Sequence, residues 1–372
     1  MAEIVCCYGS SGSFKTAQIL FLAKYAYKRW RKLTRLASCD GGGWKPLEPA
    51  IEAKLIEAWN VSAIENPRSV LRKLSQGYWP KVVTAPGKPP HLVLQDDIQT
   101  VRDRIGVMAF EGLTSVANII MRDALNKQLV VAGDQAGSKG PVQFDETVTL
   151  ASLGGTETQT KEKYSFATPG NYNDAQRAVY DFCTNTRSLP CPLVYWSALE
   201  ARGEEEDTKK TIIGPAVVGK AMTSQVGAWV GDLIHLEDYY EEQPDPLHKL
   251  TDEDRKRGVR QRVKQITKVR AWFIRHPDSI TGMLFPAKPR VAPNMIPKLL
   301  EVYPGGYFEP TTEAGIDAYL EVVDKLQGEA STGLAGWMKS IDEAREAGSK
   351  VGGTDAAKAD PKLVAATTGA KP

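Results

Sequence analysis

The sequence lacks the features that would place it in several simple classes. Its 372 residues carry a formal net charge of only +2, so no overall field draws it to nucleic acid, and a basic surface for such a partner must be local. It has no run of about 18 apolar residues and no secretory leader, so we expect neither a membrane span nor export. Apolar residues make up 42% and charged residues 25%, which is the ordinary composition of a globular protein.

Cysteine is also scarce, and the spacing of the cysteines contains no metal-binding motif. The five cysteines form no C-x-x-C pair, and some of them fall in segments expected to be buried strands. This pattern argues against a disulfide framework or a zinc site and indicates reduced thiols in the core of a cytosolic protein. The cysteines are Cys6, Cys7, Cys39, Cys183 and Cys191.

The most informative segment is a predicted strand, a glycine-rich turn and a predicted helix near the amino end. Apolar residues 4–8 lead into the turn, and the helix-favouring residues 17–27 follow it. Such a turn cradles phosphates because its backbone N–H groups point inward, the helix adds the positive end of its dipole, and a lysine reaches the terminal phosphates. The turn consists of Gly9, Ser10, Ser11, Gly12, Ser13, Phe14, Lys15 and Thr16.

The spacing of this turn matches the Walker A pattern G-x-x-x-x-G-K-[ST] at every defined position but one. Phe14 stands where the second glycine is expected, and glycine there lets the backbone approach the phosphates closely. Lys15 and Thr16 are in register, and Thr16 would place its hydroxyl on Mg²⁺. The alternative is an ordinary strand-to-helix turn rich in serine and glycine.

Acidic residues follow two further predicted strands. Residues 33–39 predict a strand that stops at Asp40 and three glycines. Open α/β sheets bind ligands at the carboxyl ends of their strands, so Asp40 is a candidate general base for an attacking water, or simply the start of a turn. Residues 106–110 predict a strand buried on both faces that ends at Glu111, where an acid would hold Mg²⁺ opposite Thr16.

The rest of the chain alternates predicted helices and strands with polar connections. Another strand, residues 192–198, ends near Ser197 and Glu200, where a sensor of the γ-phosphate would lie unless these are merely polar strand ends. The polar residues 150–172 are too long for a tight connection, so we expect them to be functional or disordered. Residues 84–90 form a linker rich in proline, glycine and lysine. The predicted helices cover residues 50–59, 67–75, 96–104, 173–184, 313–327 and 334–347.

A row of cations alternates with apolar residues in a predicted strand near the last third of the chain. Such a row could follow the phosphate backbone of a nucleic acid, or it could pair across strands with the acidic residues 237–242. Cross-strand pairing is the commoner arrangement, and we favour it. The cations of one parity are Arg260, Arg262, Lys264, Lys268 and Arg270.

The order of these elements resembles the RecA-like P-loop ATPases encoded by bacteriophages, over roughly residues 1–290. The phosphate loop is the specific signal, and the other motifs support it by their order. They are Asp40-Gly41-Gly42, Phe110 to Thr114, Tyr195 to Ala198, Gly214-Pro215 with Gly219-Lys220, and Ala287 to Arg290. The resemblance implies an α/β fold, a mostly parallel twisted sheet flanked by helices, with ATP bound between neighbouring subunits of a ring or filament.

The resemblance also implies roles for individual residues. Lys15 and Thr16 would hold the β- and γ-phosphates and Mg²⁺, and Glu111 would take the Walker B position. Asp40 falls where RecA-like enzymes place the catalytic carboxylate. Lys288 and Arg290 resemble the K-x-R pair that a neighbouring subunit inserts toward the γ-phosphate.

The sequence therefore predicts a RecA-like P-loop domain over residues 1–290, a C-terminal extension with helices over 291–347, and a flexible tail over 348–372. We expect a homo-oligomer that binds ATP and Mg²⁺ and acts on DNA in recombination, single-strand annealing or replication, in the cytoplasm of the host cell. Its candidate partners are single-stranded DNA and other phage proteins.

Two other functions compete with this expectation. The first is a structural or assembly component of a phage particle that keeps the fold with a degenerate nucleotide site. The substitutions at Phe14 and Glu111 leave open whether ATP is hydrolysed or only bound. The second, a small-molecule phosphotransferase, is disfavoured because no residues specify a second substrate pocket.

Overall fold

The computed structural model of the chain divides into two compact units. The first comprises Met1–Arg290 and Val302–Leu320, and the second comprises Val291–Glu301 and Glu321–Pro372. The structure describes residues 2–40, 44–61, 67–84, 91–134, 143–148, 160–165, 169–204, 211–244, 257, 263–277, 284–311 and 313–331. Several predictions lie outside these residues: most of the linker 84–90, the cations Arg260 and Arg262, the helix 334–347 and the tail 348–372.

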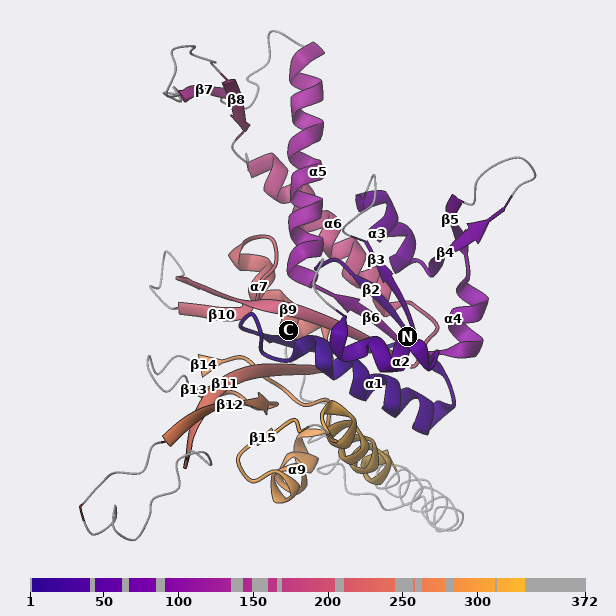
Figure 1. The fold of residues 1–372 in the computed structure, drawn as a ribbon, viewed down its shortest axis with the longest axis vertical. Helices are drawn as coiled ribbons and strands as arrows, with labels where there is room; N and C mark the ends of the chain where they lie inside the picture. Colours follow the sequence, from indigo (N-terminus) through magenta and orange to yellow (C-terminus); the bar gives the residue numbers. More distant parts are fainter. Residues whose placement is uncertain are drawn as a thin grey trace, which may run out of the picture. The chain divides into compact units, whose positions relative to one another are not determined.

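A nine-stranded sheet organises the described part of the first unit (Figure 1). Its strands run in the order β15-β12-β11-β1-β9-β6-β2-β3, with β10 paired to β9. The six strands from β11 to β3 are parallel to their neighbours, and β10, β12 and β15 are antiparallel. The strands are β1 (Glu3–Gly9), β2 (Leu33–Ser38), β3 (Ile56–Asn60), β6 (Ile105–Glu111), β9 (Leu193–Glu204), β10 (Thr211–Pro215), β11 (Asp232–Pro244), β12 (Val263–Trp272) and β15 (Tyr307–Phe308).

The strand order brings together residues that are far apart in the sequence. β9 is inserted between β1 and β6, so the carboxyl ends of β1, β9, β6 and β2 meet at one edge, called here the carboxyl edge. All seven residues of β6 are buried, as predicted for a strand covered on both faces. The predicted fold class, an α/β fold with a mostly parallel sheet flanked by helices, is confirmed.

Helices cover both faces of the sheet (Figure 1). Alternate residues of β1 face opposite sides, and Cys6 and Tyr8 join a core cluster with apolar residues of α5, α6 and α7. Helix α1 packs against β1, β2 and β6. The helices are α1 (Lys15–Trp30), α2 (Glu48–Glu52), α3 (Pro67–Ser75), α4 (Ile98–Arg104), α5 (Leu113–Asp134), α6 (Pro169–Arg187), α7 (Gly219–Trp229) and α9 (Ile296–Val302), with helical residues at 316–331.

Short elements complete the described chain. Three two-stranded sheets stand apart from the main one: β4 (Tyr78–Val83) with β5 (His91–Asp96), β7 (Gln143–Val148) with β8 (Thr160–Ser165), and β13 (His276–Pro277) with β14 (Leu284–Phe285). Two 3-10 turns cover Lys45–Leu47 and Pro293–Met295. None of the described helices has both the length and the hydropathy that a bilayer crossing requires.

The five cysteines behave as predicted for core residues. All five are buried and free of disulfides. Burial raises the pKa of the Cys7 thiol to about 12, so the neutral thiol predominates at ordinary pH. The described cysteines are therefore small apolar packing groups.

One local prediction is wrong, because pairing with a more distant strand overrides the local pattern. The helix predicted over 50–59 ends at Glu52 as α2, and Ile56–Asn60 form β3, parallel to β2. The expectation that residues 150–172 are functional or disordered stays a prediction; among the described residues of that segment, Thr160–Ser165 form β8, which pairs with β7.

The acidic segment after residue 236 continues β11 without interruption and pairs with the basic strand β12, so the favoured cross-strand pairing is confirmed for the described residues. Glu237 lies opposite Arg270, and the Lys268 amine forms an ion pair with Glu241. The Arg270 guanidinium lies over the ring of Tyr239, at 4.0 Å from the ring centre.

Candidate nucleotide-binding site

The loop between β1 and α1 has the backbone conformation that its motif requires. Gly9 is packed so tightly against the Leu236 carbonyl of β11 that a side chain there would collide with it. Phe14 is the residue just before α1 and adopts a left-handed conformation, with φ 60° and ψ 21°. The residue is 53% exposed. The position where the Walker A pattern has glycine is therefore one where glycine is the unstrained residue, and the exposed Phe14 occupies it.

The Lys15 amine lies inside the loop and is bonded to the loop itself. It donates to the Gly9 carbonyl at 3.0 Å, to Ser13 Oγ at 2.9 Å and to the Ser10 carbonyl. Burial lowers the pKa of Lys15, and the charges of Asp238, Asp40 and Glu200 act in the opposite direction.

Thr16 and Glu111 meet at the carboxyl edge, although they are 95 residues apart in the sequence. The Thr16 hydroxyl donates to Glu111 Oε1, and Glu111 is 4% exposed. A hydroxyl from the first turn of α1 therefore faces an acid at the end of β6, as the sequence predicts for the two protein groups nearest to Mg²⁺.

The donor set fits Mg²⁺ bound together with phosphate. Within the described residues, no group of three or more His, Cys, Asp or Glu side chains is arranged to hold a metal ion. Mg²⁺ commonly takes one or two protein oxygens and completes its octahedron with waters and substrate phosphates. Thr16 and Glu111 supply such a partial set.

Asp40 lies beside this pair, at the end of the strand adjacent to β6. Ser38 is opposite Glu111 in the last pair of the register of β2 and β6, and Asp40 follows Ser38 by two residues. The Ser115 hydroxyl donates to Asp40 Oδ1, and Asp40 is exposed. Gly112 has a φ of 83°, and a side chain there would collide with the Asp40 carboxyl. The structure thus brings a hydrogen-bonded, solvent-accessible carboxylate to the same edge as Lys15, Thr16 and Glu111.

Ser197 is buried behind the edge. Its Oγ accepts a hydrogen bond from the Gly112 N–H at 2.9 Å, so it supports the turn after β6. Tyr195, two residues earlier on β9, donates from its hydroxyl to the Lys15 carbonyl at 2.9 Å and braces the first turn of α1. The sequence did not predict this contact, because its two residues are 180 positions apart and no local motif marks it.

Lys288 and Arg290 lie at the opposite edge of the sheet within the same chain. The Arg290 side chain is 5% exposed and forms ion pairs with Asp232, at 3.1 Å, and with Glu3. Glu3 begins β1, whose seven residues place Gly9 roughly 20 Å away at about 3.3 Å per residue. The Lys288 backbone pairs with Leu233, and burial lowers the pKa of its amine. Within one chain, these two cations are therefore not brought to the loop.

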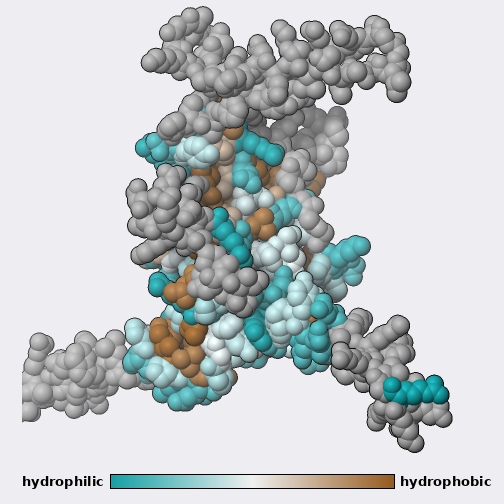
Figure 2. Space-filling model, turned by 90° about the vertical axis from the view of Figure 1, so that its left-hand side faces the viewer, coloured by the Kyte–Doolittle hydropathy of each residue, from teal (hydrophilic) through white to brown (hydrophobic). Residues whose placement is uncertain are grey.

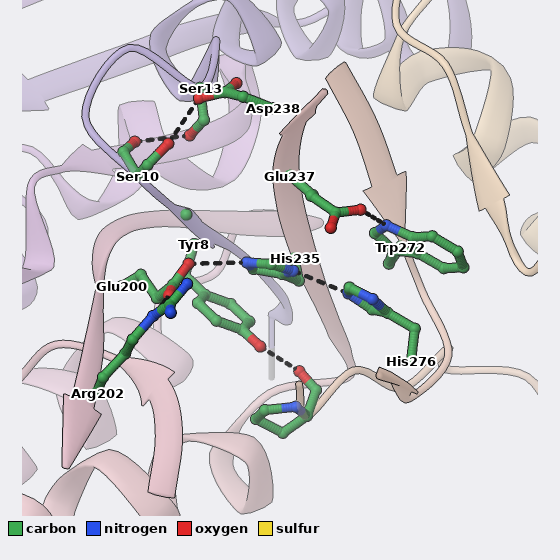
Figure 3. Close-up of polar contacts among 12 residues, drawn as sticks. Tyr8, Ser10, Ser13, Glu200, Arg202, His235, Glu237, Asp238, Trp272 and His276 are labelled. Atoms are coloured by element: carbon green, nitrogen blue, oxygen red, sulfur yellow. Dashed lines mark hydrogen bonds and ion pairs between the residues drawn. The ribbon is translucent and has the colours of Figure 1, made fainter. Parts of the chain in front are cut away.

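A chain of buried polar groups that the sequence did not predict lies beside Tyr8 (Figure 3). His235 Nε2 lies 3.0 Å from Glu200 Oε2, and His235 Nδ1 lies 2.9 Å from His276 Nε2. Burial by itself raises the pKa of Glu200, but hydrogen bonds from His235 and Arg202 outweigh it, so that pKa lies below its usual value. The partners are 35 and 41 residues from His235, so no short motif could have signalled them.

A second unpredicted contact ties the loop to β11. The Ser10 hydroxyl donates to Asp238 Oδ2 at 2.7 Å. Figure 3 shows Asp238 directed toward Ser10 and Ser13, while the neighbouring Glu237 points away toward Trp272. Alternation along β11 therefore places Asp238 on the side of the loop and Glu237 on the other.

Comparison with known proteins adds two distant structural similarities. No family model matches the chain, and no curated protein sequence matches it. The flagellar accessory protein FlaH from Methanocaldococcus jannaschii is 8% identical over 77% of this chain and 79% of its own, with a TM-score of 0.32. The KaiC-like protein PH0186 from Pyrococcus horikoshii OT3 is 7% identical over 76% of this chain and 89% of its own, also with a TM-score of 0.32. The fold class stated above follows from the strand order and the loop of this chain itself.

Proposed function

We propose that the protein binds ATP and Mg²⁺ at Gly9–Thr16 and hydrolyses the ATP. The observation that carries this proposal is the contact between the Thr16 hydroxyl and the Glu111 carboxylate. In an ordinary turn rich in serine and glycine, nothing requires a contact with a buried acid from a strand two positions away in the sheet. In a phosphate loop this contact is expected, because the threonine and the Walker B acid act on the same ion.

Several residues of the chain have separate roles in this proposal. The Lys15 amine exchanges the carbonyl oxygens of Gly9 and Ser10 for phosphate oxygens, and the start of α1 adds the positive end of its dipole. Mg²⁺, when bound, neutralises charge on the β- and γ-phosphate oxygens. Asp40, held by Ser115, orients a water and takes its proton as the water attacks the γ-phosphorus, while the bond from phosphorus to the bridging oxygen breaks and ADP leaves with that oxygen.

We further propose that the active form is a homo-oligomer acting on DNA in the host cell, as the resemblance to phage RecA-like ATPases implies. In that assembly Lys288 and Arg290 would act on the site of a neighbouring subunit. Arg290 would first have to leave its ion pairs with Glu3 and Asp232. The described cations of β12 give little support to a DNA surface, because Lys268 pairs with Glu241 and Arg270 stacks on Tyr239.

The proposal is tested by ATP turnover of the purified chain with Mg²⁺, in the presence and absence of single-stranded DNA. We expect hydrolysis that is lost in Lys15→Ala, and stimulation by DNA if the DNA role holds. Nucleotide binding that is unchanged in Lys15→Ala, together with no turnover under either condition, would remove the enzyme assignment. Sedimentation with ATP present tests the oligomer, and a monomer would remove the role of Lys288 and Arg290 in a neighbouring site.

A specific observation favours a second candidate, a structural or assembly component of a phage particle. The Lys15 amine is satisfied by the loop's own oxygens, and Phe14 replaces the usual glycine, as in a loop that no longer needs a ligand. This candidate predicts that the chain copurifies with mature particles and shows no heat of binding when titrated with ATP and Mg²⁺. Binding of ATP at micromolar concentrations would eliminate it.

A further inference from the structure

Strand β11 extends past the end of β1 and rises beside the phosphate loop. Gly9, the last residue of β1, is opposite Leu236, and β11 continues from there to Pro244. Its pairing with β12 is continuous over this extension, so side chains alternate regularly between the two sides. The Ser10 hydrogen bond shows that Asp238 is on the loop side, and alternation puts Tyr240 on that side as well.

Asp238 offers a hydrogen-bond acceptor that the protein itself does not use. Its Oδ2 accepts from the Ser10 hydroxyl, whereas its Oδ1 is buried and has no hydrogen-bond partner among the described residues. Buried carboxylate oxygens in native proteins are normally satisfied. The negative charge of Asp238 also raises the pKa of Lys15, against the effect of burial.

Tyr240 presents an aromatic ring to solvent at the same place. It is 68% exposed, whereas its neighbour Tyr239 is covered by the Arg270 guanidinium. Two residues of an antiparallel strand span about 6.8 Å, so the ring stands one step beyond the Asp238 carboxylate. Figure 2 views the molecule from the left of Figure 1, and among its coloured residues the hydrophobic ones form small patches separated by hydrophilic ones. An exposed aromatic ring beside an acceptor that the described residues leave unused suits a planar ligand that carries hydrogen-bond donors.

We infer that Asp238 and Tyr240 recognise the nucleoside part of the bound nucleotide. The Asp238 carboxylate accepts hydrogen bonds from the ribose hydroxyls, and the Tyr240 ring stacks on the base. This inference rests on the proposed function, and it adds residues that distinguish a nucleotide from phosphate alone.

The position of the two residues relative to the metal ligands supports this assignment. Glu111 is on β6, two strands to one side of β1, and Asp238 is on β11, the next strand on the other side. Their strands are three spacings apart, roughly 14 Å at about 4.8 Å each. Terminal phosphates held between Lys15 and Glu111 therefore direct the sugar and base of an extended nucleotide toward β11. A carboxylate would repel phosphate at that place, whereas hydroxyl donors suit it.

Titration calorimetry with two ligands tests the inference on the full chain in the presence of Mg²⁺. The ligands are ATP and inorganic tripolyphosphate, which has the phosphates without the nucleoside. We expect Asp238→Ala and Tyr240→Ala each to weaken ATP binding about tenfold or more, the effect expected from losing a charged acceptor or a stacked base. Tripolyphosphate binding should be unchanged in Tyr240→Ala, and unchanged or tighter in Asp238→Ala because a negative charge near Lys15 is removed.

Matched control variants separate this role from simpler explanations. Glu242→Ala removes a charge from an exposed residue on the same side of β11, and Tyr172→Ala removes an exposed tyrosine from α6. Both controls should bind ATP like the wild type. Equal weakening of ATP and tripolyphosphate by Asp238→Ala would show that it only shapes the loop and would overturn the inference.

The two levels of the argument can fail separately. If the wild type binds tripolyphosphate as tightly as ATP, no residue recognises the nucleoside, and the inference fails while the phosphate loop stands. If the wild type binds neither ligand, the proposed function fails and the inference fails with it. Tyr240 is exposed, so its variant keeps the test valid even if Asp238→Ala does not fold.

Discussion

The left-handed backbone at Phe14 predicts that a glycine variant at this position is more stable than an alanine variant, which is the reverse of the usual order within a helix. At this position φ is 60° and ψ is 21°. An L-residue in that region costs about 1–2 kcal/mol, which glycine avoids. Glycine in turn costs about 0.4–1 kcal/mol through the greater freedom of the unfolded chain. We therefore expect Phe14→Gly to be more stable than Phe14→Ala by about 1 kcal/mol, both variants having lost the same aromatic ring.

The assay is urea denaturation of the two variants, analysed with a common slope. The control is the same pair of substitutions at Lys24, an exposed residue within α1. There the backbone is helical, and Lys24→Gly should be less stable than Lys24→Ala by about 1 kcal/mol. The difference in free energy of unfolding between the glycine and the alanine variant should thus have opposite signs at the two sites, and the two differences should lie about 2 kcal/mol apart. Finding Phe14→Ala as stable as Phe14→Gly, or more so, would refute the assignment of strain to this loop.

Three other predictions concern the site and its supports. Glu111→Gln should raise the Mg²⁺ concentration needed for half-maximal ATP turnover by about tenfold or more, measured in a magnesium titration; an unchanged midpoint would count against its role at the metal. Arg290→Ala removes the guanidinium that forms an ion pair with the fully buried Asp232, and it should lower the free energy of unfolding by about 3 kcal/mol. Lys288→Ala should change the free energy of unfolding by less than about 1 kcal/mol, and equal effects of the two variants in urea denaturation would contradict the structural role of Arg290. Asp97, the residue before α4, forms ion pairs with Arg35 at 2.6 Å and with Lys81 at 2.9 Å. Burial raises the pKa of Asp97, but the hydrogen bonds from these cations outweigh that effect and hold the pKa below its ordinary value, so the carboxylate stabilises the fold at neutral pH and loses that contribution as the pH falls through the depressed pKa. Asp97→Asn should therefore reduce the acid dependence of the urea midpoint below about pH 4, and an unaltered dependence would refute this role.

The strand, turn and helix around Gly9–Thr16 were predictable because their signal is local. The apolar run of β1, the small residues from Gly9 to Ser13 and the pair Lys15-Thr16 lie within one short segment, and each acts on its immediate neighbours. The strand before Glu111 was predictable for a related reason, since a continuous apolar run can be buried only between two covered faces. The pairing of β11 with β12 also followed from the charges of the two segments.

The prediction at residues 50–59 shows where local pattern ceases to decide. Apolar residues there recur at helical spacing, yet Ile56–Asn60 form β3. These residues pair with β2 at the edge of the sheet, and no residue type within the segment indicates that β2 would be available as a partner. Tertiary pairing decided the secondary structure.

Taken alone, the amino-acid sequence determined the strands that end at Gly9 and Glu111 and the turn that joins β1 to α1, because periodicity and turn chemistry depend on neighbours along the chain. Only the tertiary structure decided that Glu111 faces Thr16, that Asp238 reaches Ser10 and that Arg290 is held at the far edge by Glu3 and Asp232. These contacts join residues 58 to 287 positions apart. The order of strands in the sheet sets which of them meet, and that order results from burying all the strands at once.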